Sequence, residues 1–103
     1  MSEASIQNYI MKKLSEIPFS EWEKATITNR AGSQDIKGHI RGYYIAIEVK
    51  TTNGKLSRIQ EYRIVQTNKK GALSFWSTSW NEVSDKLNEF ARTKGFALYD
   101  GLL

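Results

Sequence analysis

Apolar residues at helical spacing open the chain. Over residues 2–17 they recur on one face, which predicts an amphipathic helix with Ser2 as its N-cap. Pro18 cannot continue a helix, so we expect this element to end there. The apolar positions are Ile6, Tyr9, Ile10, Leu14 and Ile17. Residues 22–29 alternate between polar and apolar types, which predicts a strand, and residues 30–34 are typical of a loop.

Two apolar stretches in the middle of the chain predict a β-hairpin. Residues 35–40 and 43–50 are joined only by Arg41 and Gly42. So short a connection is typical of two antiparallel strands with a tight turn. The segment that follows, residues 51–56, contains an Asn-Gly pair and is expected to be a loop.

The next elements are a helix and a short strand. Ser57 and Gln60 have the spacing of a capping box, in which each residue satisfies a backbone N–H of the other. A helix is therefore expected over residues 57–70, and Gly71 is a natural C-terminal stop. Residues 72–77 then predict a strand.

The last predicted element is a helix over residues 81–93, ended by Gly95. Its apolar face consists of Val83, Leu87, Phe90 and Ala91. The tail, residues 96–103, is compatible with a last strand or with loose packing. The element order is thus α-β-β-β-α-β-α, which predicts an α/β domain with a mixed sheet flanked by helices.

Composition narrows the class of protein. A chain of 103 residues is the size of one domain, here residues 1–103. It has no long apolar run and no secretory-type start, so we expect a cytoplasmic protein with no membrane span. With no Cys and one His, a metal site must use oxygen ligands, which favours Mg²⁺, with Mn²⁺ as a substitute. The net charge of +4 suits a polyanion such as nucleic acid, although many small domains are as basic.

The predicted hairpin brings two carboxylates and an ammonium to one end of one face. With a two-residue turn, Ile40 pairs with Tyr43, and counting outward places Asp35 directly opposite Glu48. Lys50, two residues beyond, shares their face. The opposite, apolar face contains Ile36, Gly38, Ile40, Tyr43, Ile45, Ile47 and Val49. A turn with an odd number of residues would separate the two carboxylates.

Opposed carboxylates destabilise a sheet unless they bind something. At about 5 Å and an effective dielectric of about 20 they repel by roughly 3 kcal/mol, and a domain is stable by only about 5–15 kcal/mol. A hard divalent cation turns this repulsion into chelation. The resulting chemistry is metal-assisted phosphodiester hydrolysis, with a protonated Lys50 stabilising charge on the phosphate. The ordinary alternative is a solvated strand end with a Glu48–Lys50 salt bridge.

The same residues resemble a nuclease superfamily. Asp35 followed by Glu48-Val49-Lys50 resembles the core of the PD-(D/E)xK nucleases, with Gln34 at the place of the family's loosely kept Pro. More narrowly, three motifs resemble in order and spacing the virus-type replication-repair nuclease (VRR-NUC) domain, over about residues 3–79. These motifs are GSQDIKG (32–38), IEVK (47–50) and GKLSRIQ (54–60).

The resemblance implies a restriction-endonuclease-like fold and a metal-dependent, structure-specific endodeoxyribonuclease. It implies Asp35, Glu48 and the backbone carbonyl of Val49 as metal ligands and Lys50 as the catalytic lysine. Glu3 matches a further ligand, bound directly or through water. Compact stand-alone members resemble Holliday junction resolvases and are expected to be homodimers, since a two-fold symmetric junction needs two symmetric cuts. Branched DNA and a second copy of the chain are therefore the expected partners.

Several of these residues also have a structural explanation. Glu3 suits the first turn of a helix, where the macrodipole favours an acid. Gln60 is explained by the capping box and is also a candidate catalytic residue beside the site. Lys55, Ser57 and Arg58 are candidates for DNA binding, the alternative being an ordinary solvated helix start.

The three tryptophans have two possible roles. Trp22, Trp76 and Trp80 are interpreted as core or interface residues, with base stacking as the alternative.

Two alternative functions are compatible with the sequence. A nuclease preferring flaps or nicked duplex is the alternative within the same class. A DNA-binding module without catalysis is the alternative from another class, although such a module gains nothing from opposed carboxylates near phosphates.

Overall fold

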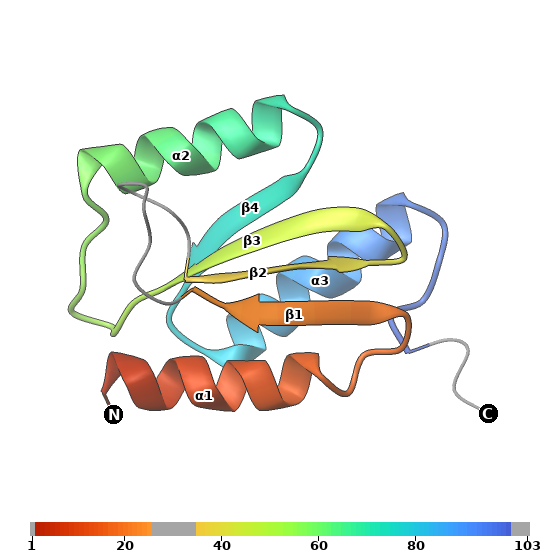
Figure 1. Ribbon diagram of the computed structural model, residues 1–103, viewed down its shortest axis with the longest axis horizontal. Coiled ribbons are helices and arrows are strands. Elements are labelled where there is room, and N and C mark those ends of the chain that lie inside the picture. The colour runs from red at the N-terminus through yellow and green to blue at the C-terminus, as the bar shows by residue number, and fades with distance from the viewer. Residues whose placement is uncertain (1, 26–34, 100–103) are drawn as a thin grey trace.

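The computed structural model describes residues 2–25 and 35–99, which form three helices and four strands (Figure 1). The elements are α1 (Glu3–Leu14), β1 (Ser20–Lys24), β2 (Ile36–Ile40), β3 (Tyr43–Val49), α2 (Arg58–Lys69), β4 (Leu73–Ser77) and α3 (Trp80–Thr93). This order confirms the predicted α-β-β-β-α-β-α arrangement and its α/β class. Gln34, the end of the predicted first strand and the last residues of the tail lie outside the described residues.

The four strands form one mixed sheet in the order β1-β2-β3-β4. The first three are antiparallel neighbours, and β4 runs parallel to β3. Arg41 and Gly42 form the β2–β3 turn with φ of 51° and 86°, so both adopt the left-handed conformation of a tight hairpin turn. Ile40 pairs with Tyr43 across this turn. The two-residue turn on which the predicted register depends is therefore confirmed.

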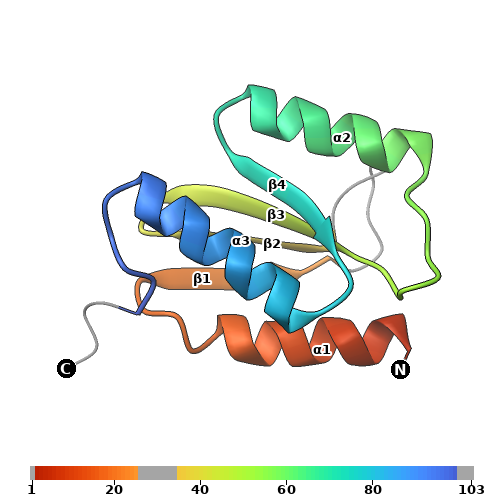
Figure 2. The same ribbon diagram turned by 180° about the vertical axis from the view of Figure 1, so that it is seen from behind.

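Helices cover the two faces of the sheet unequally. α1 and α3 pack on one face, and α2 lies against the other (Figures 1 and 2). The apolar core fills the layer between the sheet and the first two of these helices. α2 has no fully buried residue. It is attached to β4 by Asn68, whose side-chain amide makes two hydrogen bonds of 2.8 Å with the backbone of Ser74.

Some predicted boundaries were wrong. β1 begins at Ser20 and not at residue 22, because its five residues pair with the five of β2 and Ser20 lies opposite Ile40. α1 ends at Leu14, although Ile17 beyond it is still buried. In the tail, residues 96–99 form no strand, and Leu98 packs into the core.

None of the helices in the described part of the chain is long and apolar enough to cross a membrane.

Candidate active site

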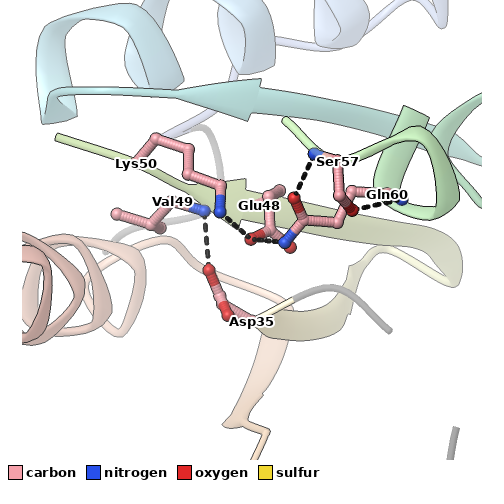
Figure 3. A network of polar contacts seen from close by, with 6 residues as sticks. All are labelled: Asp35, Glu48, Val49, Lys50, Ser57 and Gln60. Atoms are coloured by element: carbon pink, nitrogen blue, oxygen red, sulfur yellow. Dashed lines mark hydrogen bonds and ion pairs between the residues drawn. The ribbon is translucent and has the colours of Figure 1, made fainter. Parts of the chain in front are cut away.

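The predicted carboxylates meet at the carboxyl end of β3. Ile36 pairs with Ile47, so Asp35, one residue earlier, lies at the level of Glu48, as the hairpin register predicts. Oδ2 of Asp35 accepts a hydrogen bond of 2.8 Å from the backbone N–H of Val49 (Figure 3). This bond ties the start of β2 to the end of β3, so the position of one carboxylate is fixed relative to the strand that carries the other.

Glu48 is buried, with an exposed fraction of 2%. Its Oε2 accepts a hydrogen bond of 2.9 Å from Nε2 of Gln60 and lies 3.6 Å from Nζ of Lys50 (Figure 3). Its Oε1 is buried and has no hydrogen-bond partner among the described residues. An unpartnered buried carboxylate oxygen carries a desolvation cost that only a bound proton, cation or donor offsets.

The surroundings of Glu48 disfavour its negative charge. Burial, first of all, and then the neighbouring Asp35 carboxylate raise the pKa of Glu48 to about 8. The ammonium of Lys50 acts in the opposite direction, and the charge of Glu3 adds a smaller upward contribution to the pKa of Glu48. The site therefore favours the arrival of positive charge at this carboxyl group.

The first turn of α2 contacts the site directly. Oε1 of Gln60 accepts a hydrogen bond of 2.8 Å from the backbone N–H of Ser57, and the Ser57 hydroxyl accepts one of 3.2 Å from the backbone N–H of Gln60. This is the predicted capping box. Because the same Gln60 amide also donates to Glu48, the capping contact and the site contact, which the sequence presents as alternatives, occur together.

The loop after β3 packs on the stem of Lys50. A Cβ added at Gly54 would lie 3.2 Å from the Cβ of Lys50 and 3.2 Å from the carbonyl oxygen of Thr51, tighter than ordinary contact. The backbone N–H of Lys50 donates to the carbonyl of Ser77 in β4 at 3.0 Å. Lys50 is thus held from both sides, which leaves its ammonium directed to Glu48 (Figure 3). The sequence shows Gly54 as a turn residue, with no sign of this contact.

The residues at this strand end fit a hard divalent cation. Two carboxylates lie side by side, and one of their oxygens is buried without a partner. Mg²⁺ is commonly held by one or two carboxylates, with water and phosphate filling its shell. Across the described residues no three or more acidic or His side chains gather into a metal cage. Glu3 is half-buried in the first turn of α1, and its charge raises the pKa of Glu48. Glu3 nevertheless does not form a three-residue cluster with Glu48 and Asp35.

The candidate DNA-binding residues follow the site in the chain. Lys55, Ser57 and Arg58 are all exposed. Neither Lys55 nor Arg58 forms a salt bridge with a carboxylate of the described residues, so both positive charges face solvent. Two of the tryptophans, Trp22 and Trp80, pack against the core, whereas Trp76 is 46% exposed.

Two solved structures share this fold. One, described as a "VRR_NUC domain", aligns with a TM-score of 0.70 at 28% sequence identity, covering 84% of this chain and 94% of that chain. Another, described as a "VRR_NUC domain protein", has a TM-score of 0.73 at 17% identity, covering 99% of this chain and 98% of that chain, which is a likeness of fold. No family model matches the sequence, and no curated protein does.

Proposed function

We propose that this VRR-NUC domain, a nuclease domain of the PD-(D/E)xK type, is a Mg²⁺-dependent endodeoxyribonuclease that cuts branched DNA. The observation that carries this proposal is the buried, unpartnered Oε1 of Glu48 beside a second carboxylate and an ammonium. A salt bridge alone would leave this oxygen unsatisfied. A bound cation would satisfy it, as would a proton shared with Asp35, and only the cation also serves phosphodiester hydrolysis.

Asp35, Glu48 and the backbone carbonyl of Val49 are the oxygen donors that would hold the ion, and Glu3 would act through water. When bound, Mg²⁺ polarises a phosphodiester and lowers the pKa of a coordinated water, and Mn²⁺ has the same preference for oxygen ligands.

The remaining side chains act on geometry and charge. Lys50, with its ammonium 3.6 Å from Oε2 of Glu48, stabilises the negative charge that grows on the phosphate. Gln60 holds Oε2 of Glu48, so that Oε1 is the oxygen left for the ion. The exposed Lys55, Ser57 and Arg58 bind the DNA backbone and set the position of the duplex, without reading its sequence.

The proposal includes two further properties, a specificity for branched DNA and a homodimeric state. Both are supported by the resemblance of the motifs around Asp35, Glu48 and Gln60 to compact stand-alone VRR-NUC domains. A dimer with two-fold symmetry would place two identical sites on a two-fold symmetric junction, which needs two symmetric cuts.

The test is cleavage of an end-labelled four-way junction and of its matched linear duplex, in Mg²⁺, in Mn²⁺ and in EDTA. The proposal predicts paired, symmetric cuts in the junction that disappear in EDTA. Equal cutting of the linear duplex would reject branch specificity and retain the nuclease. Tight binding without cutting in either metal would show a non-catalytic binding module. Sedimentation at the assay concentration tests the dimer, and a monomer that still makes paired cuts would reject it.

A further inference from the structure

A pocket of about 490 Å³ lies between α1, the loop after β3 and the start of α3. In Figure 1 these three segments meet at the left end of the sheet, and in Figure 2 they meet at the right end. Its lining includes Ile6, Tyr9, Thr51, Thr52, Trp80 and Asn81. Its volume is in the range of pockets that bind small ligands.

The pocket begins where the candidate active site ends. Thr51 in its wall directly follows Lys50 in the chain. On the other side, the backbone N–H of Lys50 donates to the carbonyl of Ser77 at 3.0 Å, and the next residue, Thr78, also lines the pocket. α1 supplies Ile6 and Tyr9 one and two turns after Glu3, whose charge reaches Glu48. A group held in this pocket would therefore sit beside a phosphate held at Glu48 and Lys50.

The lining of the pocket suits a flat, neutral, heteroaromatic ring. Tyr9 is 50% exposed and Trp80 is half-buried, so two aromatic side chains border the space. None of the described residues that line it carries a charge, so this lining offers a phosphate no cationic partner. The hydroxyls of Thr51 and Thr52 and the amide of Asn81 make no hydrogen bond with any described residue, so donors and acceptors are free at the rim. Nucleobases combine stacking faces with such polar edges.

We propose that this pocket receives an unpaired base of the DNA substrate, next to the phosphate that is cut, with Tyr9 and Trp80 as its stacking surfaces. The proposal rests on the proposed nuclease function and adds to it a reason for preferring interrupted duplexes. A base in a continuous duplex must be unstacked before it can enter a pocket, and the free-energy cost is least for a base that is already unpaired. The hydroxyls and the amide at the rim give any base edge a partner, so we expect little preference among the four bases.

The test measures binding in a Lys50→Ala background with Mg²⁺, where DNA is bound and not cut. The first DNA is a labelled branched molecule with one unpaired nucleotide at the branch point. The second is the same molecule with an abasic residue at that position. Tyr9→Ala is expected to weaken binding of the first DNA on the order of tenfold, the range of one base–aromatic stack, and to leave binding of the abasic DNA unchanged. Tyr9→Phe keeps the ring and should restore the difference between the two DNAs.

A matched control separates this effect from a general loss of binding. Tyr99→Ala removes a comparably exposed tyrosine from the opposite end of the chain and should affect neither DNA. Thr52→Val, at an exposed rim position, provides a second variant if Tyr9→Ala is poorly folded, and it should weaken only the DNA that has the base.

The possible results separate the pocket from the nuclease. Equal weakening of both DNAs by Tyr9→Ala, or no weakening of either, would overturn the base-binding role. A wild-type protein that cuts DNA and binds both molecules equally would also reject the pocket, while leaving the nuclease proposal intact. A protein that neither binds nor cuts any DNA would reject both proposals.

Discussion

The amide of Gln60 donates to the buried Oε2 of Glu48 at 2.9 Å while its own oxygen caps the helix α2. One side chain therefore couples the start of a helix to the orientation of a carboxylate in the sheet. This coupling leaves the second oxygen of Glu48 without a partner among the described residues. α2 has no fully buried residue. Its first turn is therefore held in place partly by this contact with the candidate site.

Gln60→Ala and Ser57→Ala are expected to differ in their effect on metal binding. Each removes half of the capping box and should lower the free energy of unfolding by about 1 kcal/mol. Only Gln60→Ala also removes the donor to Glu48, and loss of such a partner typically weakens metal binding or activity by about tenfold or more. Calorimetric titration with Mg²⁺ and cleavage rates check this. Equal metal affinity in the two variants would show that Gln60 is only a helix cap.

Mg²⁺ should raise the melting temperature of the wild-type protein and have little effect on Glu48→Gln, because binding to the folded state alone stabilises it. Since the pKa of Glu48 is raised to about 8, the ion must displace a proton below that pH, and stabilisation by Mg²⁺ should grow as the pH rises through this value. Thermal unfolding at several pH values measures both effects. A metal-induced shift of equal size in Glu48→Gln would place the ion elsewhere.

Without metal, the same group should make the wild-type protein less stable as the pH rises. The folded-state pKa of Glu48 lies above its ordinary value of 4.5, so the stabilising proton is fully present below 4.5 and is lost as the pH approaches about 8. Glu48→Gln has no such proton, and its free energy of unfolding should not fall over this range. Urea unfolding in EDTA tests the difference between the two proteins, and parallel curves would contradict it.

Gly54→Ala should lower the rate of cleavage more than DNA affinity. The new methyl group would lie 3.2 Å from the Cβ of Lys50, so the stem of this side chain must give way by a few tenths of an ångström, and we expect its ammonium to shift with it. Small misplacements of a catalytic group reduce rates strongly, and here we expect about a tenfold lower kcat with little change in KM. Asn53→Ala, an exposed neighbour in the same loop, is the control and should behave as wild type. An unchanged kcat in Gly54→Ala would show that the loop does not position Lys50.

Glu82 gives the fold a second pH dependence, with the opposite sign. Its pKa is lowered, chiefly by the hydrogen bond from the backbone N–H of Thr78, at 2.7 Å, and also by the Ser77 hydroxyl. The stability it contributes is present above its ordinary pKa of 4.5 and is lost as the pH falls through the lower folded-state value.

Urea unfolding of Glu82→Gln should therefore show a weaker loss of stability in acid than the wild-type protein. Glu89→Gln, on the same helix and exposed, is the matched control, because Glu89 makes no hydrogen bond with any described residue. The prediction is contradicted if Glu82→Gln and the wild-type protein lose stability in parallel as the pH falls.

Local patterns in the sequence are enough to predict most of this fold. The helices follow from apolar spacing and capping residues, because both act within a few turns of chain. The position of Asp35 relative to Glu48 follows from the two-residue turn, since the length of the turn sets the register.

Contacts between distant segments are not visible in such patterns. The start of β1 depends on which residues β2 offers for pairing, and the hold of Gly54 on Lys50 depends on how the loop folds back. The bond from Gln60 to Glu48 needs α2 to lie over the end of β3, and the pocket at Tyr9 and Trp80 needs α1 and α3 side by side. Three of these features join separate elements of the chain, and the contact of Gly54 with Lys50, although local, depends on the path of the loop, so the sequence supplies the residues without their contacts.

The most direct test of the metal-dependent nuclease site compares Lys50→Ala with Lys55→Ala on one labelled branched DNA, with cleavage and binding measured in parallel in Mg²⁺. We predict that Lys50→Ala binds DNA with nearly wild-type affinity and does not cut it, because its ammonium acts on the reacting phosphate. Lys55→Ala should bind more weakly and still cut when DNA is saturating. Cleavage by Lys50→Ala at the wild-type rate would contradict the proposed site.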